Sequence, residues 1–298
     1  MRLLYAITSY NRYFLLKNTV ESVFAFAPQG DVLIADDGST DQALLQYYRQ
    51  LEAEGRVVVL QKSHAGDAQK MHGGLYDCMN RATEYAIEKG YSHIFYLQDD
   101  VQFMWKDSDL LHRIEHVFAT HADAAMVNPI FQKKIIARSM RDRLEPYGDA
   151  DAWHLKPYGI ADIGCVRVEL LKEKQWRFGA TETKNHVQWS TWGYKLYCLR
   201  CPVLAWVPWP PVYNRERRQG VERKPRRAFL LKPLSERQVK TLRSLPLQKI
   251  PYTEDFCFPW GWWCWSPYCF TILNMEYWNN LRKAVKRGEC FPHPVIRW

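Results

Sequence analysis

The stretch that decides the fold is DVLIADDGSTD, residues 31–41. Its first half, 31–35, is a short apolar run of the kind that forms a buried strand. The strand is expected to end at the Asp-Asp-Gly turn, and Asp41 then stands where it can cap a helix predicted over 42–54. The pattern therefore predicts one strand–turn–helix unit with two adjacent acids at its turn.

The same alternation extends along the chain in both directions. Apolar runs predict further strands over 2–8, 56–60, 92–97 and 124–128. Helical patterns are expected over 12–26 and 68–89. Gly73 and Gly74 interrupt the second of these helical patterns, which indicates either a helix break or a backbone that approaches a ligand closely. Strands that alternate with helices predict an α/β fold, a mostly parallel sheet with helices on both faces.

Polar clusters follow three of the expected strands. Residues 8–11 read TSYN, residues 36–39 read DDGS, and residues 98–100 read QDD. The carboxyl ends of parallel strands form the edge where open α/β sheets bind ligands. A single Asp-Gly turn would be ordinary, but three clusters at one edge together predict a binding site.

The residue types indicate the ligand. Asp99 and Asp100 are hard oxygen donors suited to Mg²⁺ or Mn²⁺, and such an ion allows carboxylates to face a negatively charged diphosphate. Asp36 can accept hydrogen bonds from a base or a ribose hydroxyl. The glycine-rich loop with Lys-Ser/Thr that cradles phosphates in other nucleotide folds does not occur in the sequence. The phosphates would therefore need a metal ion or a basic segment.

Three segments carry a resemblance to a known family. ITSYNR at 7–12, DVLIADDGSTD at 31–41 and GYSHIFYLQDDV at 90–101 resemble, in order and spacing, the inverting family-2 glycosyltransferases with the GT-A fold. The resemblance covers about residues 2–207, so a transferase domain is expected over 1–207 and a C-terminal extension over 208–298. It implies a nucleotide-sugar donor, with UDP as the usual nucleotide, and Mn²⁺ or Mg²⁺ as cofactor.

The resemblance also implies roles for individual residues. Asp36 would hold the base, Asp99 would contact the ribose or the sugar, and Asp100 would hold the metal ion. The family's metal motif usually reads Asp-any-Asp, and here Gln98 takes the first position, which lowers the expected metal affinity. The nucleotide-sugar-binding residues implied as a group are Thr8, Tyr10, Asp36, Asp37, Lys70 and Asp99.

An inverting transferase needs a carboxylate that takes the proton of the acceptor hydroxyl. In the resembled family this carboxylate lies about a dozen residues before a Gly-aromatic pair, which here is Gly193-Tyr194. Glu182 then occupies the position of the catalytic base. His186, one turn later on the expected helix, and Asp162 are the alternatives, Asp162 also as a contact for sugar hydroxyls.

Composition and charge limit the class of protein. Of the 298 residues 47% are hydrophobic, which suits a large folded core, and the chain start shows no signal peptide. A cytoplasmic protein with reduced cysteines is therefore expected. Residues 213–250 hold twelve Lys or Arg against three Glu, a net charge of +9 that equals that of the whole chain. This segment indicates an anionic partner such as a diphosphate or an acidic lipid, or else a solvated loop.

The aromatic run at 256–275 contains no charged residue, but two prolines and four closely spaced tryptophans argue against a membrane-spanning helix. Two interpretations stay open: the rings pack on the catalytic domain, or they face a lipid-linked acceptor or the membrane surface, which would make the protein peripheral. The saccharide or lipid-linked acceptor itself is not specified by the sequence.

Two other functions also agree with parts of the sequence. A nucleic-acid-binding protein could use the basic 213–250 segment, but acids at the strand ends would repel phosphate. A nucleotidyltransferase also uses an acidic metal site on a similar sheet, but residues 8–12 lack its glycine-rich, basic loop. The sequence therefore favours a metal-assisted glycosyltransferase.

Overall fold

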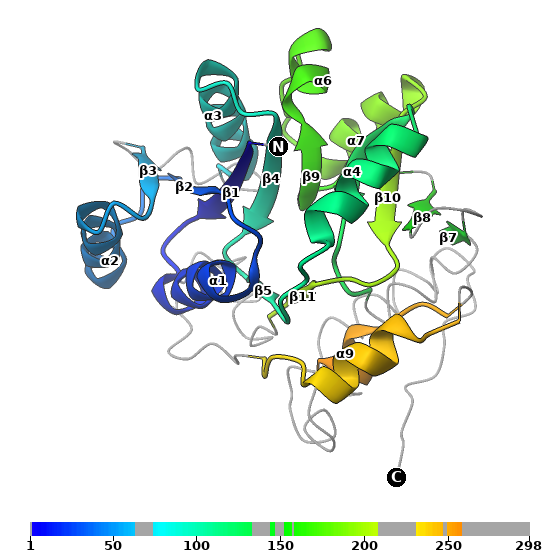
Figure 1. The fold of residues 1–298 in the computed structure, drawn as a ribbon. Coiled ribbons are helices and arrows are strands. Elements are labelled where there is room, and N and C mark those ends of the chain that lie inside the picture. Colours follow the sequence, from blue (N-terminus) through cyan, green and yellow to red (C-terminus); the bar gives the residue numbers. More distant parts are fainter. Residues whose placement is uncertain are drawn as a thin grey trace, which may run out of the picture.

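The computed structural model describes residues 2–62, 74–132, 144–146, 152–156, 158–207, 231–246 and 249–257. Lys70, most of the basic segment and the Trp-rich tail lie outside these described residues. The described chain forms one large sheet with helices packed on both faces (Figure 1).

The nine strands of the main sheet are β1 (Leu3–Ser9), β2 (Asp31–Asp36), β3 (Val58–Gln61), β4 (His93–Gln98), β6 (Ala124–Asn128), β7 (Leu144–Pro146), β8 (Ala152–Leu155), β9 (Gly164–Arg167) and β10 (Lys195–Leu199). A separate two-stranded sheet pairs β5 (Val101–Phe103) with β11 (Leu204–Trp206). The helices are α1 (Tyr13–Phe26), α2 (Gln42–Ala53), α3 (Leu75–Glu88), α4 (Leu110–Thr120), α6 (Val168–Glu173), α7 (Glu182–Thr191), α9 (Glu236–Arg243) and α10 (Thr253–Phe256).

The strand order is β3-β2-β1-β4-β9-β6-β10-β8-β7. β3, β2, β1 and β4 run parallel, and β6 and β10 are parallel to each other. β9 is antiparallel to both β4 and β6, and β8 is antiparallel to β10. The predicted α/β class and mostly parallel sheet are thus confirmed.

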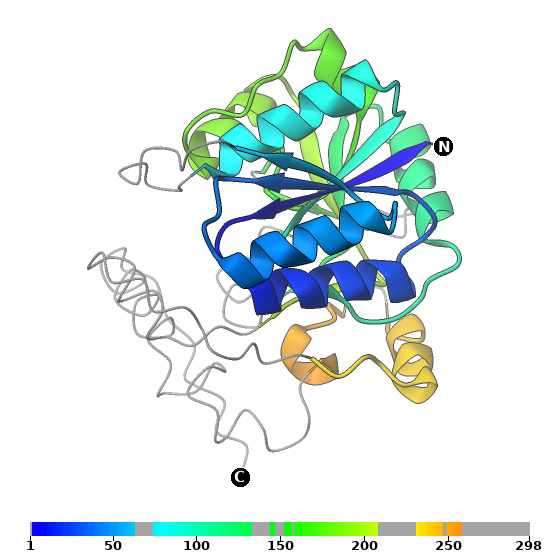
Figure 2. The same ribbon diagram turned by 90° about the vertical axis from the view of Figure 1, so that its left-hand side faces the viewer.

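Alternating side chains of the central strands bury both faces of the sheet. In β1, Tyr5 and Ile7 belong to the core on the side of α1, α2 and α4, while Leu4 and Ala6 belong to the core under α3, α6 and α7. Figure 2 shows α1 and α2 on one side of the sheet and α3 on the other. Because parallel strands are buried on both faces, they read as continuous apolar runs, which made them visible in the sequence.

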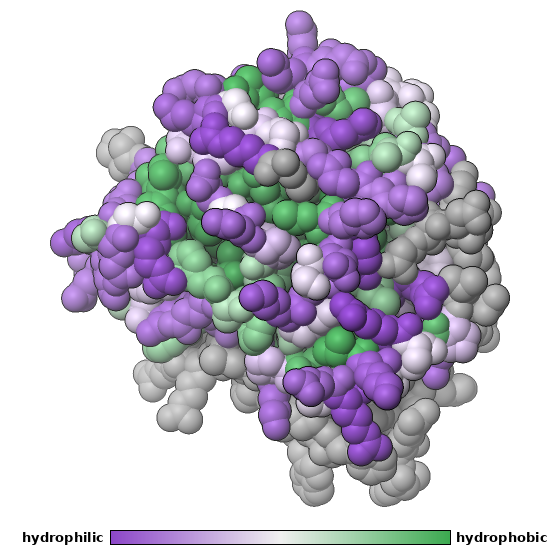
Figure 3. Space-filling model, in the orientation of Figure 1, coloured by the Kyte–Doolittle hydropathy of each residue, from purple (hydrophilic) through white to green (hydrophobic). Residues whose placement is uncertain are grey.

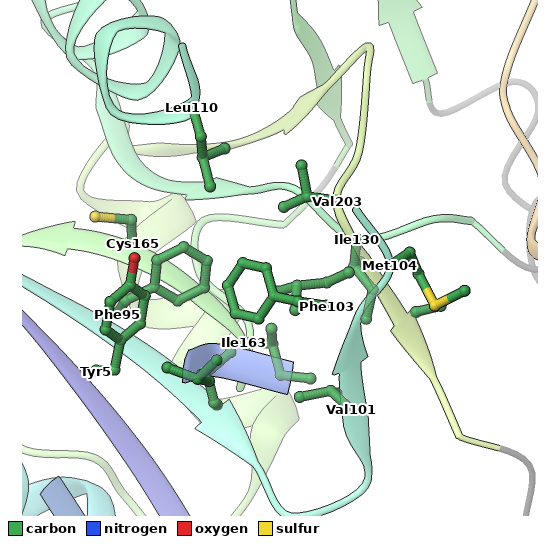
Figure 4. Packing of buried hydrophobic residues seen from close by; sticks show 14 of the residues in the cluster. Tyr5, Phe95, Val101, Phe103, Met104, Leu110, Ile130, Ile163, Cys165 and Val203 are labelled. Atoms are coloured by element: carbon green, nitrogen blue, oxygen red, sulfur yellow. The ribbon is translucent and has the colours of Figure 1, made fainter. Parts of the chain in front are cut away.

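The apolar run at 195–206 forms two strands in different sheets. β10 ends at Leu199, the chain turns through Cys201 and Pro202, and β11 then pairs antiparallel with β5. The small sheet docks on the main one through Phe103, whose ring lies 6.1 Å from that of Tyr5 and 6.3 Å from that of Phe95 (Figure 4). This docking fixes the segment that directly follows Asp100.

The described C-terminal segments share the core of the first 207 residues. The Leu234 N–H donates to the Met104 carbonyl at 2.8 Å, and Thr253 N–H donates to Gln132 at 2.8 Å. Leu231, Leu242, Leu245 and Cys257 are buried in the same apolar cluster as α1 and α4. Among the described residues, none of the helices has the length and apolar character that crossing a membrane requires.

Candidate functional site

The three polar clusters come together at one edge of the sheet, as the sequence predicted. β1 lies between β2 and β4, with Ser9 opposite Asp36 and Thr8 opposite Gln98. All three strands run in the same direction, so the residues that follow them meet at their carboxyl ends. The Thr8 hydroxyl is buried and points toward β4, where it donates to the Leu97 carbonyl at 3.4 Å.

The first two clusters are bound to each other. Asn11 adopts a left-handed conformation with φ of 52°, and its Oδ1 accepts hydrogen bonds from the Thr40 and Asp41 N–H groups at 2.8 and 2.9 Å. The Asn11 N–H in turn donates to Ser39 Oγ at 2.9 Å. Asn tolerates this backbone conformation better than most residues, which explains its place in the turn. The loop after β1 thus holds the acidic turn in a fixed position.

Asp36 is committed to the turn itself. Its carboxylate is fully buried; one oxygen accepts the N–H groups of Gly38 at 3.0 Å and Ser39 at 2.7 Å. The other oxygen accepts the Ser39 hydroxyl and the Tyr48 hydroxyl, the latter at 2.8 Å. With four donors on two buried oxygens, Asp36 has little capacity for a nucleotide base. The role of Asp36 as the residue that holds the base stays a prediction, and these contacts favour its neighbour Asp37 for that role.

Asp37, the next residue, has the free capacity that Asp36 lacks. Its Oδ2 accepts the Gly74 N–H at 2.7 Å, and its buried Oδ1 has no hydrogen-bond donor among the residues that the structure describes; Lys62 Nζ lies 3.8 Å from this oxygen. A Cβ at residue 74 would collide with this carboxylate, so the glycine is required by close approach. Burial raises the pKa of Asp37, while the Gly74 N–H and the Lys62 charge oppose the shift.

Replacing the two acids should separate their roles. Asp36→Ala is expected to lower the free energy of unfolding by about 3–5 kcal/mol, because four buried donors lose their acceptor. Asp37→Ala removes one hydrogen bond and a costly buried charge, so a loss of only about 1 kcal/mol is expected. Urea unfolding of both variants measures this difference. Equal losses would contradict the division into a structural and a ligand-facing acid.

An ion pair joins the third cluster to the segment that follows β1. Arg12 donates to Asp99 Oδ1 at 2.7 Å, and the Asp99 side chain is only 4% exposed. Asp99 Oδ2 is also buried and has no hydrogen-bond donor within the described part of the chain. The predicted contact of Asp99 with a ribose or sugar therefore depends on this one oxygen. Thr19 fixes the backbone at the same point by donating to the Asp99 carbonyl at 3.0 Å.

Asp100, the predicted metal ligand, lies where the main sheet passes into the small one. It is buried, and its carbonyl accepts the Val207 N–H at 2.8 Å. Val207 is the last described residue before 208–230, and Leu231, the first after them, exchanges hydrogen bonds with Gln102 at 2.7 and 3.1 Å. Val207 and Leu231, the described residues on either side of 208–230, are thus hydrogen-bonded to Asp100 and to Gln102, two residues further along the chain.

No group of three or more His, Cys, Asp or Glu side chains that could hold a metal ion occurs in the described ranges. A divalent ion at Asp100 would therefore need oxygen atoms from its ligand, as Mg²⁺ does when one or two carboxylates and substrate phosphates hold it. Asp99 Oδ2, which is buried and has no hydrogen-bond donor in the described ranges, is a second oxygen of the right type on the preceding residue. These residues fit a metal ion that arrives with a diphosphate.

A second acidic group lies on the same edge of the sheet. β9 starts at Gly164, opposite Tyr96 near the end of β4, so Asp162 precedes it at the edge that Asp99 occupies. The charge of Glu182 acts on Asp162, and the Tyr76 side chain interacts with it. Burial, and then the charge of Glu182, raises the pKa of Asp162 to about 7, although the interaction with Tyr76 lowers it. Two of the predicted base candidates are therefore neighbours.

Glu182 is exposed in the first turn of α7, where a negative charge is favourable. Hydrogen bonds hold the backbone around Glu182. Thr181 caps the helix, and the buried Asn185 Oδ1 accepts the Gly179 N–H at 2.7 Å. Asn80 of α3 holds the same loop with two hydrogen bonds to the Phe178 backbone, at 2.7 and 3.1 Å. An exposed carboxylate on a fixed backbone can reach an incoming hydroxyl.

The third base candidate, His186, is half-buried on the next turn of α7. Its ring lies 4.6 Å from the ring of Tyr158, and its Nδ1 is buried without a hydrogen-bond partner among the described residues. Burial lowers the pKa of His186, and the charge of Glu182 opposes this shift. This packing suits a residue that lines the site better than one that exchanges protons.

Sequence reasoning missed three residues of this edge: Arg12 as the partner of Asp99, Lys62 beside Asp37, and Tyr76 beside Asp162. Arg12 belongs to the quoted ITSYNR segment, so its position next to the third cluster was the available signal. Lys62 and Tyr76 carry no motif, and only the folded chain brings them to the site. Lys70, also predicted here, lies outside the described residues.

Solved structures with a similar fold are glycosyltransferases. Over 69% of this chain, residues 1–349 of S. aureus TarS superpose with a TM-score of 0.51 and 16% sequence identity. GalNAc-T7 with UDP, GalNAc and Mn²⁺ matches over 69% of the chain at a TM-score of 0.51 and 14% identity. Mannosyltransferase PcManGT from Pyrobaculum calidifontis, in complex with GDP-Man and Mn²⁺, matches over 73% at 0.50 and 16% identity.

These similarities cover 60% of the TarS chain, 44% of the GalNAc-T7 chain and 60% of the PcManGT chain, so this protein spans about half of each. No protein-family model and no curated protein sequence matches the chain. At this level of identity the comparison shows the fold, which is that of GT-A glycosyltransferases. The fold predicted from the three sequence segments is thereby confirmed.

Proposed function

We propose that this protein is a metal-assisted, inverting glycosyltransferase that moves a sugar from UDP to an acceptor hydroxyl. The observation that carries the proposal is the shared edge of the sheet. Asp37, Asp100 and the Asp162–Glu182 pair lie at this edge of a GT-A fold. TarS has also been crystallised in complex with UDP, and GalNAc-T7 with UDP and Mn²⁺, which supports a nucleotide-sugar donor and a divalent ion.

The nucleotide would bind over the loops after β1 and β2. Thr8 and Tyr10 would border the nucleotide, and Asp37 rather than Asp36 would accept the base N–H, because Asp37 Oδ1 has no hydrogen-bond donor in the described part of the chain. Lys62, half-buried at 3.8 Å from that oxygen, supplies a positive charge beside the nucleotide. Uracil suits such a carboxylate because it presents a ring N–H between two carbonyl oxygens.

Asp100 would hold Mn²⁺ or Mg²⁺ together with oxygens of the diphosphate. The bound ion supplies Lewis-acid stabilisation of the negative charge that develops on the leaving diphosphate. The Asp99–Arg12 pair beneath it keeps the backbone of this turn in place. A rigid turn matters, since electrostatic stabilisation depends on groups that are already oriented.

On the acceptor side, Glu182 would take the proton of the attacking hydroxyl. The acceptor oxygen forms a bond to the anomeric carbon while the bond from that carbon to the diphosphate breaks on the opposite side, which inverts the configuration. The proton goes to Glu182, and Asp162 provides a second negative charge that attracts it. An exposed base is suited to a large acceptor that approaches from solvent, such as a saccharide or a lipid-linked sugar.

Ligand-induced stabilisation tests the proposal before any acceptor is known. UDP and UDP-sugars with Mn²⁺ at about 100 times their Kd should stabilise the fold by about 2.7 kcal/mol, which raises the Tm by about 5 °C. Without Mn²⁺ the shift should be smaller, and ADP serves as a control diphosphate. A panel of uridine, guanosine, thymidine and cytidine nucleotide sugars that leaves the Tm unchanged with Mn²⁺ present would sink the proposal.

A further inference from the structure

A groove with a volume of about 920 Å³ lies between α9 and the loop that follows β5. None of its lining residues belongs to the candidate donor or acceptor groups described above. In Figure 3, hydrophobic atoms are framed by hydrophilic side chains in the region of α9. The groove is therefore a second, separate feature of the surface with mixed chemistry.

The floor of the groove is apolar and firmly held. It includes Phe26 at the end of α1, Trp105, and Leu234 and Val239 from the α9 segment. Trp105 is only 4% exposed, and its indole N–H donates to the Pro202 carbonyl at 2.9 Å. The backbone bond from Leu234 to Met104 fixes the opposite wall. A rigid apolar floor favours an apolar ligand, because little ordering accompanies binding.

The rim of the groove is cationic. Arg243 lies over the Trp105 ring at 5.2 Å, and Asp107 holds this guanidinium at 3.2 Å while also binding Arg113 at 3.2 Å. One buried carboxylate thus serves two guanidinium groups, and Arg243 keeps half of its surface exposed. Because Asp107 neutralises the Arg243 guanidinium only in part, Arg243 can also bind a second anion.

Two lysines complete the rim. Lys106 and Lys240 are exposed lining residues, and neither makes an ion pair with any described residue. Glu236 is the acidic residue among the lining side chains. Three cations against one acid around an apolar floor complement a ligand that joins a doubly charged anion to an apolar body.

We propose that this groove binds the phosphate head and the adjoining apolar chain of a lipid phosphate. A phosphate monoester carries up to two negative charges and several acceptor oxygens, which matches a guanidinium and two ammonium groups better than a single carboxylate does. The three cations of the rim against the single acid Glu236 therefore point to an anionic ligand with an apolar body.

Binding of octyl phosphate to the full-length protein, measured by calorimetry below the micelle concentration, tests the proposal. The test variant is Lys106→Glu/Lys240→Glu, and Arg49→Glu/Lys172→Glu on α2 and α6 is a control with the same change in charge. We expect the groove variant to bind octyl phosphate at least about tenfold more weakly and the control within about twofold of wild type, since only the first removes direct charge contacts.

Three further probes decide the chemistry. Inorganic phosphate and octyl glucoside should each bind at least about tenfold more weakly than octyl phosphate, because each lacks one half of the ligand. Vesicles of phosphatidylglycerol against phosphatidylcholine show whether the lipid is bound from a bilayer or as a free molecule. Equal binding of inorganic phosphate or octyl glucoside, no binding of octyl phosphate, or equal affinity in the groove variant would overturn the proposal, whatever the outcome for sugar transfer.

Discussion

Asp100→Asn is expected to reduce sugar transfer to background and to abolish the Mn²⁺-dependent part of UDP binding. The amide keeps the size of the side chain, so the buried position and the backbone bond to Val207 are preserved. It removes the negative charge that holds the ion next to the diphosphate. Loss of the ion's stabilisation of the leaving group is expected to cost at least about a thousandfold in turnover.

The measurement pairs a UDP thermal shift, with and without Mn²⁺, with transfer or donor hydrolysis assays. Gln98→Asp is the matched variant at the same strand end, because it restores the acid at the first position of the resembled metal motif. We expect Gln98→Asp to tighten Mn²⁺ binding, while Asp100→Asn weakens it. Full activity and an unchanged Mn²⁺ effect in Asp100→Asn would remove Asp100 from the site.

The sheet was predictable because its decisive patterns are local. Residues 31–35 read as a buried strand and lie within β2, which extends one residue further to Asp36, and the 124–128 run forms β6 with the expected bounds. Turn and cap residues follow the same logic, since Asp41 accepts the N–H groups of Ala43 and Leu44 at the start of α2. Each of these signals depends on neighbours a few residues away, and such signals survive in a single sequence.

The order in which the strands pair across the sheet could not be predicted from the sequence. Nothing in the apolar run at 195–206 indicates that it divides between two sheets, and β9 lies antiparallel between β4 and β6 although its sequence is an ordinary apolar strand. The same limit explains the site: Asp36 and Asp37 are adjacent acids with similar sequence context. Their different surroundings arise only in the folded chain, where Tyr48 of α2 donates to Asp36 and Gly74 before α3 donates to Asp37.

A second large loss of sugar transfer is expected when the proposed base on the acceptor side is replaced. Glu182→Gln should lower sugar transfer by about 10² or more at pH 8, because the amide cannot accept a proton from the acceptor hydroxyl. Donor affinity should not change, since the carboxylate of Glu182 is proposed to act on the acceptor hydroxyl and not on the nucleotide. Equal transfer rates in the variant and the wild type would move the base to Asp162 or His186.

The substitution Asp162→Asn tests whether Asp162 assists the base Glu182, because it should change how the stability of the protein depends on pH. With a folded pKa of about 7 against an ordinary value of 3.8, Asp162 keeps its proton in the folded protein when the unfolded chain has lost it. Stability therefore falls as the pH rises from about 4 to about 7 and then levels off. Asp162→Asn removes this penalty, so it should stabilise the protein at pH 8 by about 2–4 kcal/mol and have little effect at pH 4.

The same substitution should impair transfer while it stabilises the fold. In the wild type, transfer is expected to rise through pH 7 as Asp162 ionises and its charge attracts the acceptor proton; in Asp162→Asn this rise should disappear. Urea unfolding at pH 4 and pH 8, together with the pH profile of transfer, measures both effects. A carboxylate that takes part in acid–base chemistry often lowers the stability of the fold. For a purely structural acid, replacement by Asn would instead lower the free energy of unfolding at every pH. Destabilisation by Asp162→Asn at pH 8, with an unaltered pH profile, would therefore show that Asp162 supports the fold rather than the reaction.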